Sequence, residues 1–249
     1  MIDLVYQYNV SMQLFHIQSD KIREKWNNIE LFSIPELLSQ LRKVLRIKKR
    51  DKICIQYSDN KWTTRYELSI QDWTDKDLTG EIIYSQTFSF SEKNVSMLIA
   101  MPNKREKAEL IVQKLTEIWV KNIYFRVGEH SIIRQWNDKK ADRLDKISHE
   151  ALEQSRWTQL PDIKFFKSEN DLRDFISWKN VIIANMNWLP YWEFDKNKSN
   201  DLCGVIWPEG WFSEKDLNLF DDAKVIDLWE NVLRMETASI VLAWILKNS

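Results

Sequence analysis

From Met101 onward, short apolar runs alternate with stretches of helical periodicity, and this alternation restricts the fold more than any other feature. Apolar residues recur at helical spacing at 108–118, 141–152 and 235–246. Between these stretches lie short runs typical of buried strands, at 123–127, 181–184, 203–206 and 225–228. Helices and strands in alternation are typical of a mostly parallel sheet covered on both faces. The sequence therefore predicts an α/β fold for this part of the chain.

The first part of the chain has a different pattern, in which apolar side chains alternate with polar ones. This period of two predicts strands at 53–57 and 66–70, and further short strands are expected at 81–85, 87–90 and 95–100. We therefore expect a small β-rich domain, a barrel of short strands, at 1–92 and an α/β domain at 93–249.

Charge restricts how the chain could bind nucleic acid. It carries 36 Lys and Arg against 37 Asp and Glu, a formal net charge of −1, so such binding would need a local basic patch. The segment RKVLRIKKR at 42–50 is one, on and just after a short amphipathic helix predicted from the apolar spacing at 37–45. It is either a solvated helix end or an RNA contact made by Arg42, Arg46 and Lys49.

Several classes of protein are excluded. Cys54 and Cys203 lie far apart and outside any zinc-binding spacing, so no disulfide framework and no metal site is expected, and the expected location is cytoplasmic. The apolar stretch at 238–246 is far shorter than the ~20 residues that span a bilayer, and the first residues are not a signal peptide. Neither GxGxxG nor a P-loop motif occurs, which argues against Rossmann and P-loop nucleotide sites.

Four motifs in the second domain carry more information than their periodicity. They are KAELIVQKLTEIWVKNIYFRVGEHS (107–131), EALEQSRWTQLPDI (150–163), GVIWPEGWFSEKDL (204–217) and DLWENVLRMETA (227–238). In this order they resemble the RsmE family of ribosomal RNA uridine-N3 methyltransferases, whose forms are roughly DLIVQKATELGV followed by SERS, EAAEQSGRTRVPEI, IGPEGGFSEEEL and LGPRILRTETA. The first domain resembles the family weakly, mainly through RKVLRIKKRDKI (42–53).

This resemblance implies a fold, a cofactor and a partner. It implies a SPOUT α/β domain threaded as a trefoil knot behind a PUA-like RNA-binding domain, in a homodimer. The implied reaction is methylation of one uridine of 16S rRNA, in the small ribosomal subunit, at N3 with S-adenosylmethionine as donor. Loops after parallel strands meet at one sheet edge, where ligands bind. The resemblance places the cofactor there, at Ile206, Trp207, Pro208, Glu209, Gly210, Trp211, Leu228, Trp229, Leu233 and Thr237.

The implied chemistry needs help with a proton. Uracil N3 is mostly protonated at neutral pH, so a base or a positive charge must assist its loss. Arg234, as base or charge stabiliser, and Glu236, in orientation, are the candidate catalytic residues at the start of the last predicted helix. The alternative role of Glu236 is to favour the helix N-terminus, and that of Thr237 is to cap it. Arg126 and His130, the latter in a slot where the family has Arg, are further candidates for RNA contact.

Glycine is scarce in this chain and tryptophan is abundant. There are 4 Gly and 13 Trp among 249 residues, whereas glycine usually makes up ~7% of a protein. Trp119, Trp207, Trp211 and Trp229 stand where the family forms have glycine. We hypothesise that the source organism reads UGA as glycine at these four positions, and that Trp62, in a predicted hairpin turn, is a fifth. Backbone approaches a ligand closely only where no Cβ intervenes, so indoles at 207, 211 and 229 are expected to crowd an adenosine pocket.

Two alternative functions remain open from the sequence. A ribosome-associated RNA-binding protein that has lost catalysis would be consistent with tryptophan at the four glycine slots. A SPOUT enzyme acting on transfer RNA would share the cofactor loops but would not be expected to share the EQS and TE motifs.

Overall fold

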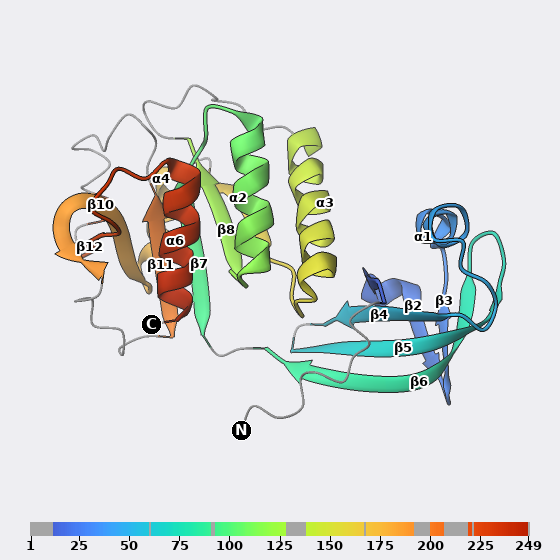
Figure 1. Ribbon diagram of the computed structural model, residues 1–249. Coiled ribbons are helices and arrows are strands. Elements are labelled where there is room, and N and C mark those ends of the chain that lie inside the picture. The colour runs from blue at the N-terminus through green and yellow to red at the C-terminus, as the bar shows by residue number, and fades with distance from the viewer. Residues whose placement is uncertain are drawn as a thin grey trace. The chain divides into compact units, whose positions relative to one another are not determined.

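The computed structural model describes residues 12–59, 61–90, 93–127, 138–166, 168–191, 200–206, 219–220 and 222–248. The chain divides into two compact units, Met1–Phe90 and Ser91–Ser249, and Figure 1 shows the elements of each. This division falls close to the boundary expected at 92. None of the described helices is long and apolar enough to cross a membrane.

The first unit is built on a six-stranded sheet with the order β1-β4-β5-β6-β3-β2. Its strands are β1 Leu14–His16, β2 Ile22–Lys25, β3 Asn28–Leu31, β4 Lys52–Ser58, β5 Trp62–Trp73 and β6 Leu78–Ser89. Neighbouring strands are antiparallel except for β1 and β4, which are parallel. The β-rich first domain is thus confirmed.

Two details of the predicted strands are wrong. The segments 81–85 and 87–90 lie, up to Ser89, in one long strand, β6, in which Ile83, Tyr84 and Ser85 are all exposed, so that the alternation is interrupted and resembles a break. The run at 95–100 lies in β7, Asn94–Ala100, which belongs to the sheet of the second unit.

The segment that carries the basic cluster forms two short helical pieces. After the 3-10 turn η1, Ser19–Lys21, and strands β2 and β3, the chain enters α1, Pro35–Ser39, with Pro35 in its first turn. A π-helical turn, η2 Gln40–Val44, follows directly. Leu38 and Leu41 are buried against the sheet, so the amphipathic pattern is realised over less than three turns.

The second unit contains a six-stranded parallel sheet with the order β12-β10-β11-β7-β8-β9. Besides β7, its strands are β8 Asn122–Arg126, β9 Asp162–Phe166, β10 Asn180–Pro190, β11 Asp201–Ile206 and β12 Lys224–Asp227. The parallel sheet of the predicted α/β domain is confirmed. The trefoil knot stays a prediction, because segments 192–199 and 207–218 lie outside the described residues.

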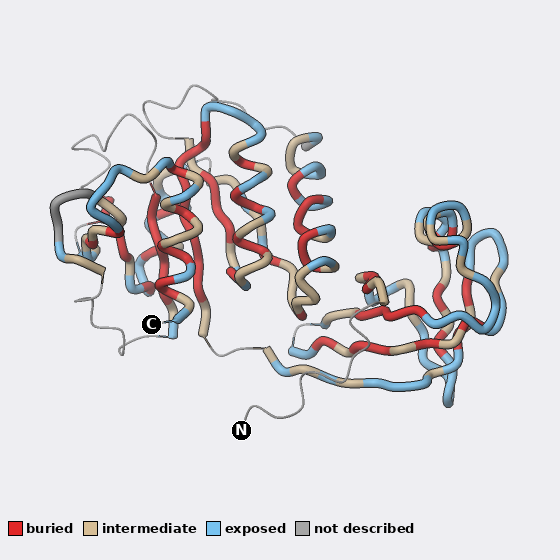
Figure 2. The backbone as a smooth tube through the Cα atoms, viewed as in Figure 1, coloured by how far each residue is buried: buried red, intermediate tan, exposed pale blue. Residues whose placement is uncertain are grey.

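Three helices lie in a row over this sheet (Figure 1). They are α3 Asp138–Ser155, α2 Arg105–Glu117 and α6 Met235–Lys247, with α2 packed between the other two. A shorter helix, α4 Glu169–Ile176, begins with Ser168 accepting the Asp171 N–H. Figure 2 shows the strands beneath the row as mostly buried. Helix α4 and strand β9 were not predicted from the sequence.

Helix α6 contacts β7 and β11. At this contact β11 carries a glycine, Gly204, which has no side chain. A Cβ on Gly204 would lie 2.7 Å from Met97 Sδ, and 2.9 Å from both Leu242 Cδ2 and Leu246 Cδ1. All three neighbours are fully buried. Glycine therefore sets how closely the helix approaches the sheet.

We predict that Gly204→Ala lowers the free energy of unfolding of the second unit by about 1–3 kcal/mol, because three packed side chains must move at once. Urea unfolding followed by circular dichroism measures the change. Glu230→Ala, at an exposed position outside the helix, is the control and should change stability by less than about 0.5 kcal/mol. Equal stability of Gly204→Ala and the parent chain would contradict the close packing.

Candidate functional site

All six strands of the second sheet run in one direction, so their C-terminal ends lie along one edge. The pairing register places Ile206 beside Ile99 and Val205 beside Ile183, which also pairs with Val225. The ends of β11 and β12 therefore reach the same edge, on either side of β10. This is the edge at which parallel sheets bind ligands.

Helix α6 begins at this same edge. Lys93 Nζ, just before β7, lies 3.4 Å from the carbonyl oxygen of Lys247, the last residue of the helix. The end of α6 therefore lies beside the start of β7, and the helix runs antiparallel to the strand. Its first turn, with Glu236 and Thr237, meets the carboxyl ends of the strands.

The residues that connect β12 to α6 differ sharply in burial. Leu228 is buried and Leu233 is half-buried against the core, whereas Trp229 and Arg234 are exposed. The Trp229 N–H donates to Asp227 Oδ1 at 3.2 Å, which turns the chain directly after the strand. Apolar side chains that pack into the core thus lie beside exposed side chains along this edge.

The structure brings some predicted cofactor residues together and leaves others undescribed. Ile206, Leu228, Trp229, Leu233 and Thr237 all lie at or near the carboxyl edge of the sheet. The remaining predicted residues fall outside the described part of the chain: Trp207, Pro208, Glu209, Gly210 and Trp211.

Glu236 has an unusual carboxylate at this edge. Its side chain is 14% exposed, and its buried Oε2 atom has no hydrogen-bond partner among the described residues. The Nζ atom of Lys107 lies 3.7 Å from Oε2, which is an ion pair too long for a direct hydrogen bond. A buried carboxylate oxygen with unused acceptor capacity is costly, so a donor supplied by a ligand would be favourable there.

Lys107 was not singled out from the sequence. It lies in the first turn of α2, which follows β7 and therefore also starts at the carboxyl edge. The sequence signal for Lys107 was its position in the first motif, but its partner, Glu236, lies far away in the sequence. The N-cap of α6 is Arg234, which makes no side-chain cap bond, so a capping role for Thr237 is wrong.

Arg126 is the last residue of β8 and lies at the same edge. Its carbonyl oxygen accepts the Met101 N–H at 2.7 Å, which links the ends of β7 and β8. The guanidinium is half-buried, with Nη1 inside the protein. His130, the other RNA candidate of this unit, lies outside the described residues.

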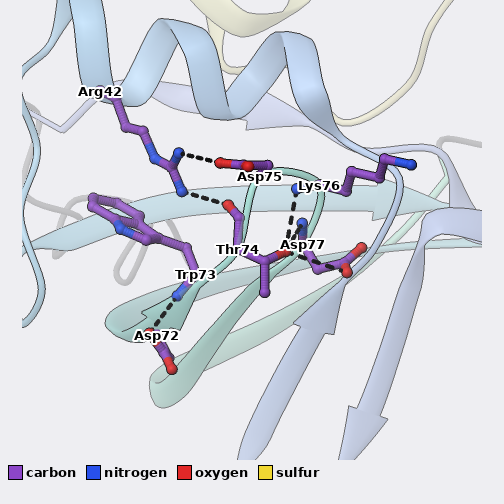
Figure 3. A network of polar contacts seen from close by, with 7 residues as sticks. All are labelled: Arg42, Asp72, Trp73, Thr74, Asp75, Lys76 and Asp77. Carbon is purple, nitrogen blue, oxygen red and sulfur yellow. Dashed lines mark hydrogen bonds and ion pairs between the residues drawn. The ribbon is translucent and has the colours of Figure 1, made fainter.

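The basic cluster of the first unit divides into a structural residue and exposed ones. Arg42 Nη1 lies 3.3 Å from Asp75 Oδ1, Nη2 donates to the carbonyl oxygen of Thr74, and the guanidinium lies 5.1 Å from the Trp73 ring centroid. Figure 3 shows Arg42 directed at the turn between β5 and β6. Within that turn, Thr74 Oγ1 accepts the N–H groups of Lys76 and Asp77.

Arg46 and Lys49 are more open to a partner. Both are exposed, and Arg46 has a φ of 54°. Lys49 Nζ lies 2.6 Å from Asp72 Oδ1, and this hydrogen-bonded ammonium lowers the pKa of the Asp72 carboxyl. An ion pair this exposed contributes little to stability, so Lys49 is available to exchange Asp72 for a phosphate.

Among the described residues, no group of three or more His, Cys, Asp and Glu side chains is placed to hold a metal ion. Cys54 and Cys203 are buried and free, and burial raises the pKa of the Cys203 thiol to about 12, so it is not a reactive thiolate.

Comparison with solved structures shows the same fold over nearly the whole chain. A ribosomal RNA small subunit methyltransferase E from Neisseria gonorrhoeae, bound to S-adenosyl methionine, matches with a TM-score of 0.76 and 17% identity, covering 95% of this chain and 97% of that chain. A Legionella pneumophila protein assigned as a methyltransferase, in complex with the cofactor SAM, matches with a TM-score of 0.76 and 19% identity, over 95% and 97%. A Porphyromonas gingivalis protein assigned as an rRNA methyltransferase matches with a TM-score of 0.75 and 23% identity, over 95% and 99%.

The sequence itself places the chain in a family. No curated protein matches it. Residues 90–247, however, match the family described as the RNA methyltransferase domain. These residues include the whole parallel sheet and helices α2, α3, α4 and α6. The chain belongs to the RNA methyltransferase domain family.

Proposed function

We propose that this protein transfers a methyl group from S-adenosylmethionine to N3 of a uridine in 16S rRNA of the small ribosomal subunit. Family membership supports RNA methylation. The fold it shares with a small-subunit rRNA methyltransferase bound to S-adenosyl methionine supports the rRNA class and the donor. The observation that carries the proposal is the first turn of α6, at the carboxyl edge of the sheet, where the buried Oε2 atom of Glu236 has no hydrogen-bond partner among the described residues.

The described residues of this edge fit the methyl donor. Buried Ile206 and Leu228, with half-buried Leu233, would hold the apolar faces of an adenosine. Residues 207–211, residues 228–229 and the Thr237 hydroxyl would supply the polar contacts. The donor, once bound, supplies an electrophilic methyl group.

The catalytic roles follow from charge and position. Arginine stays protonated at neutral pH, so Arg234 cannot serve as a base, and we assign it to stabilise negative charge on the uracil oxygens. Glu236 would accept the N3–H in a hydrogen bond, orient the uracil and take the N3 proton as N3 gains the methyl group, using Oε2, which has no hydrogen-bond donor among the described residues. Lys107 holds that carboxylate in place from α2.

RNA would be held by both units. We propose that Arg46 and Lys49 bind phosphates and that Arg126 and His130 contact the RNA near the reacting base. Arg42 supports this surface indirectly, by fixing the turn at Thr74. We further propose that the protein works as a homodimer, in which two modest basic patches act on one RNA and raise its effective concentration.

The direct test is methyl transfer from labelled S-adenosylmethionine to isolated small ribosomal subunits, followed by nucleoside mass analysis. We expect N3-methyluridine, and we expect Glu236→Gln to lower the rate by about 10²-fold or more, as loss of a positioned acid–base group does. Glu230→Gln, exposed in the preceding loop, is the control and should retain activity. Label in transfer RNA, offered as substrate in a parallel reaction, would support the alternative enzyme, and binding to the subunits without label would support the inactive binding protein.

The RNA surface has a separate test. Arg46→Glu with Lys49→Glu should weaken RNA binding and reduce the slope of log affinity against log salt, because fewer counterions are released. Lys61→Glu, exposed in the turn between β4 and β5, is the control for a single charge reversal elsewhere on the same unit. Arg42→Met should instead lower the stability of the first unit, since it removes the contacts at Thr74 and Asp75. An unchanged salt slope in the double variant would contradict the RNA contact and would show that the cluster is a solvated helix end.

A further inference from the structure

Six described residues other than glycine have a positive φ. They are Trp26 (55°), Ser33 (56°), Arg46 (54°), Arg50 (74°), Trp119 (72°) and Arg156 (55°). In this left-handed region the Cβ of an L-residue crowds the backbone, at a cost of roughly 1–2 kcal/mol, and glycine avoids that cost. Tryptophan, bulky and without a polar group close to its backbone, has no compensating local bond there.

Trp119 occupies the position after a helix that glycine usually takes. Helix α2 ends at Glu117, and Ile118 is its C-cap. The Trp119 N–H then donates to the Thr116 carbonyl at 3.1 Å, and the Val120 N–H donates to the Leu115 carbonyl at 3.0 Å. These paired bonds around one left-handed residue are the Schellman ending, for which glycine is favoured. The indole stacks on Trp157 outside the core, with the ring centroids 4.1 Å apart, and remains 44% exposed.

Trp26 lies in a tight turn in the first unit. Lys25 pairs with Asn28, so the hairpin between β2 and β3 has a two-residue loop, Trp26 and Asn27. The φ of Trp26 is positive and that of Asn27 is not. This is the pattern of a type II′ turn, whose first central residue is normally glycine. The Trp26 side chain is 99% exposed, so no packing offsets the strain.

The backbone at Trp26 and Trp119 favours glycine without any use of the motifs. Trp26 lies outside all four motifs and outside the second unit, so its positive φ is independent of the likeness to the family. Trp62 is the first residue of β5 and Trp229 follows β12, and neither has a positive φ. The hairpin argument for Trp62 is therefore wrong, and the backbone requirement at Trp119 and Trp26 stands without it.

We infer that the positions of Trp26 and Trp119 are glycine in the protein that the source organism makes, read there from UGA codons. The shortage of glycine beside 13 tryptophans fits such a reading along the whole chain. The serine and arginines at the other four left-handed positions fall outside it, because no UGA codon specifies them. Because the observations concern only the backbone at two positions in different units, they do not depend on which RNA is methylated.

Substitution in the full-length chain tests the backbone requirement. At 26 and at 119, the glycine variant should fold with an equilibrium constant about five- to thirtyfold higher than the alanine variant, the ratio that corresponds to removing the left-handed penalty. Comparing Gly with Ala cancels the lost indole, including its stack on Trp157. Trp244, exposed within α6 at helical φ, is the matched control, and there alanine should exceed glycine, because glycine weakens a helix interior. Alanine equal to glycine at 26 and 119, in urea unfolding, would overturn the requirement.

The decoding itself is read from the gene and from the protein of the source organism. We expect UGA at codons 26 and 119, and peptides whose mass corresponds to glycine at both positions. UGG codons there, or peptides that contain tryptophan, would overturn the inference.

Discussion

The contact of α6 with the centre of the parallel sheet determines where the proposed catalytic groups lie. It depends on a missing side chain, because Gly204 lets Leu242 and Leu246 settle onto β11. From that contact the helix runs to the carboxyl edge, so its first turn delivers Arg234, Glu236 and Thr237 beside the ends of β11 and β12. If the helix lay farther from the sheet, these groups would lie farther from the buried side chains of Ile206 and Leu228. The packing of the C-terminal half of α6 on the sheet thus positions the residues at the start of the helix.

Electrostatics at this edge follow from the same geometry. Two helices, α2 and α6, both start there, and each contributes one member of the Lys107–Glu236 ion pair. The pair holds a mostly buried carboxylate, one oxygen of which has no hydrogen-bond partner among the described residues. Such an oxygen stabilises the fold poorly, and we propose that it accepts a hydrogen bond from the bound uracil.

Local pattern predicted the elements better than it predicted their partners. Periodicity located β4, β5, β8, β11, α2 and α6, because burial imposes a period of two or of about 3.6 on each. It failed at β6, where the consecutive exposed residues 83–85 interrupt the alternation, and at β9, whose residues are only partly buried or exposed. It could not find Lys107, or the structural role of Arg42, because their partners Glu236 and Asp75 are brought near only by the fold. The motif likeness supplied the family, and the backbone angles at Trp26 and Trp119 added what neither periodicity nor motifs contain.

We propose that residues 207–211, which follow β11, and the turn after β12 contact the methyl donor at positions where side chains must be absent. Calorimetric titration of S-adenosylmethionine tests it most directly, into the printed chain and into a chain with glycine at 207, 211 and 229. The account predicts weak binding by the printed chain and clearly tighter binding by the glycine chain. Equal affinity of the two chains for the donor would contradict it.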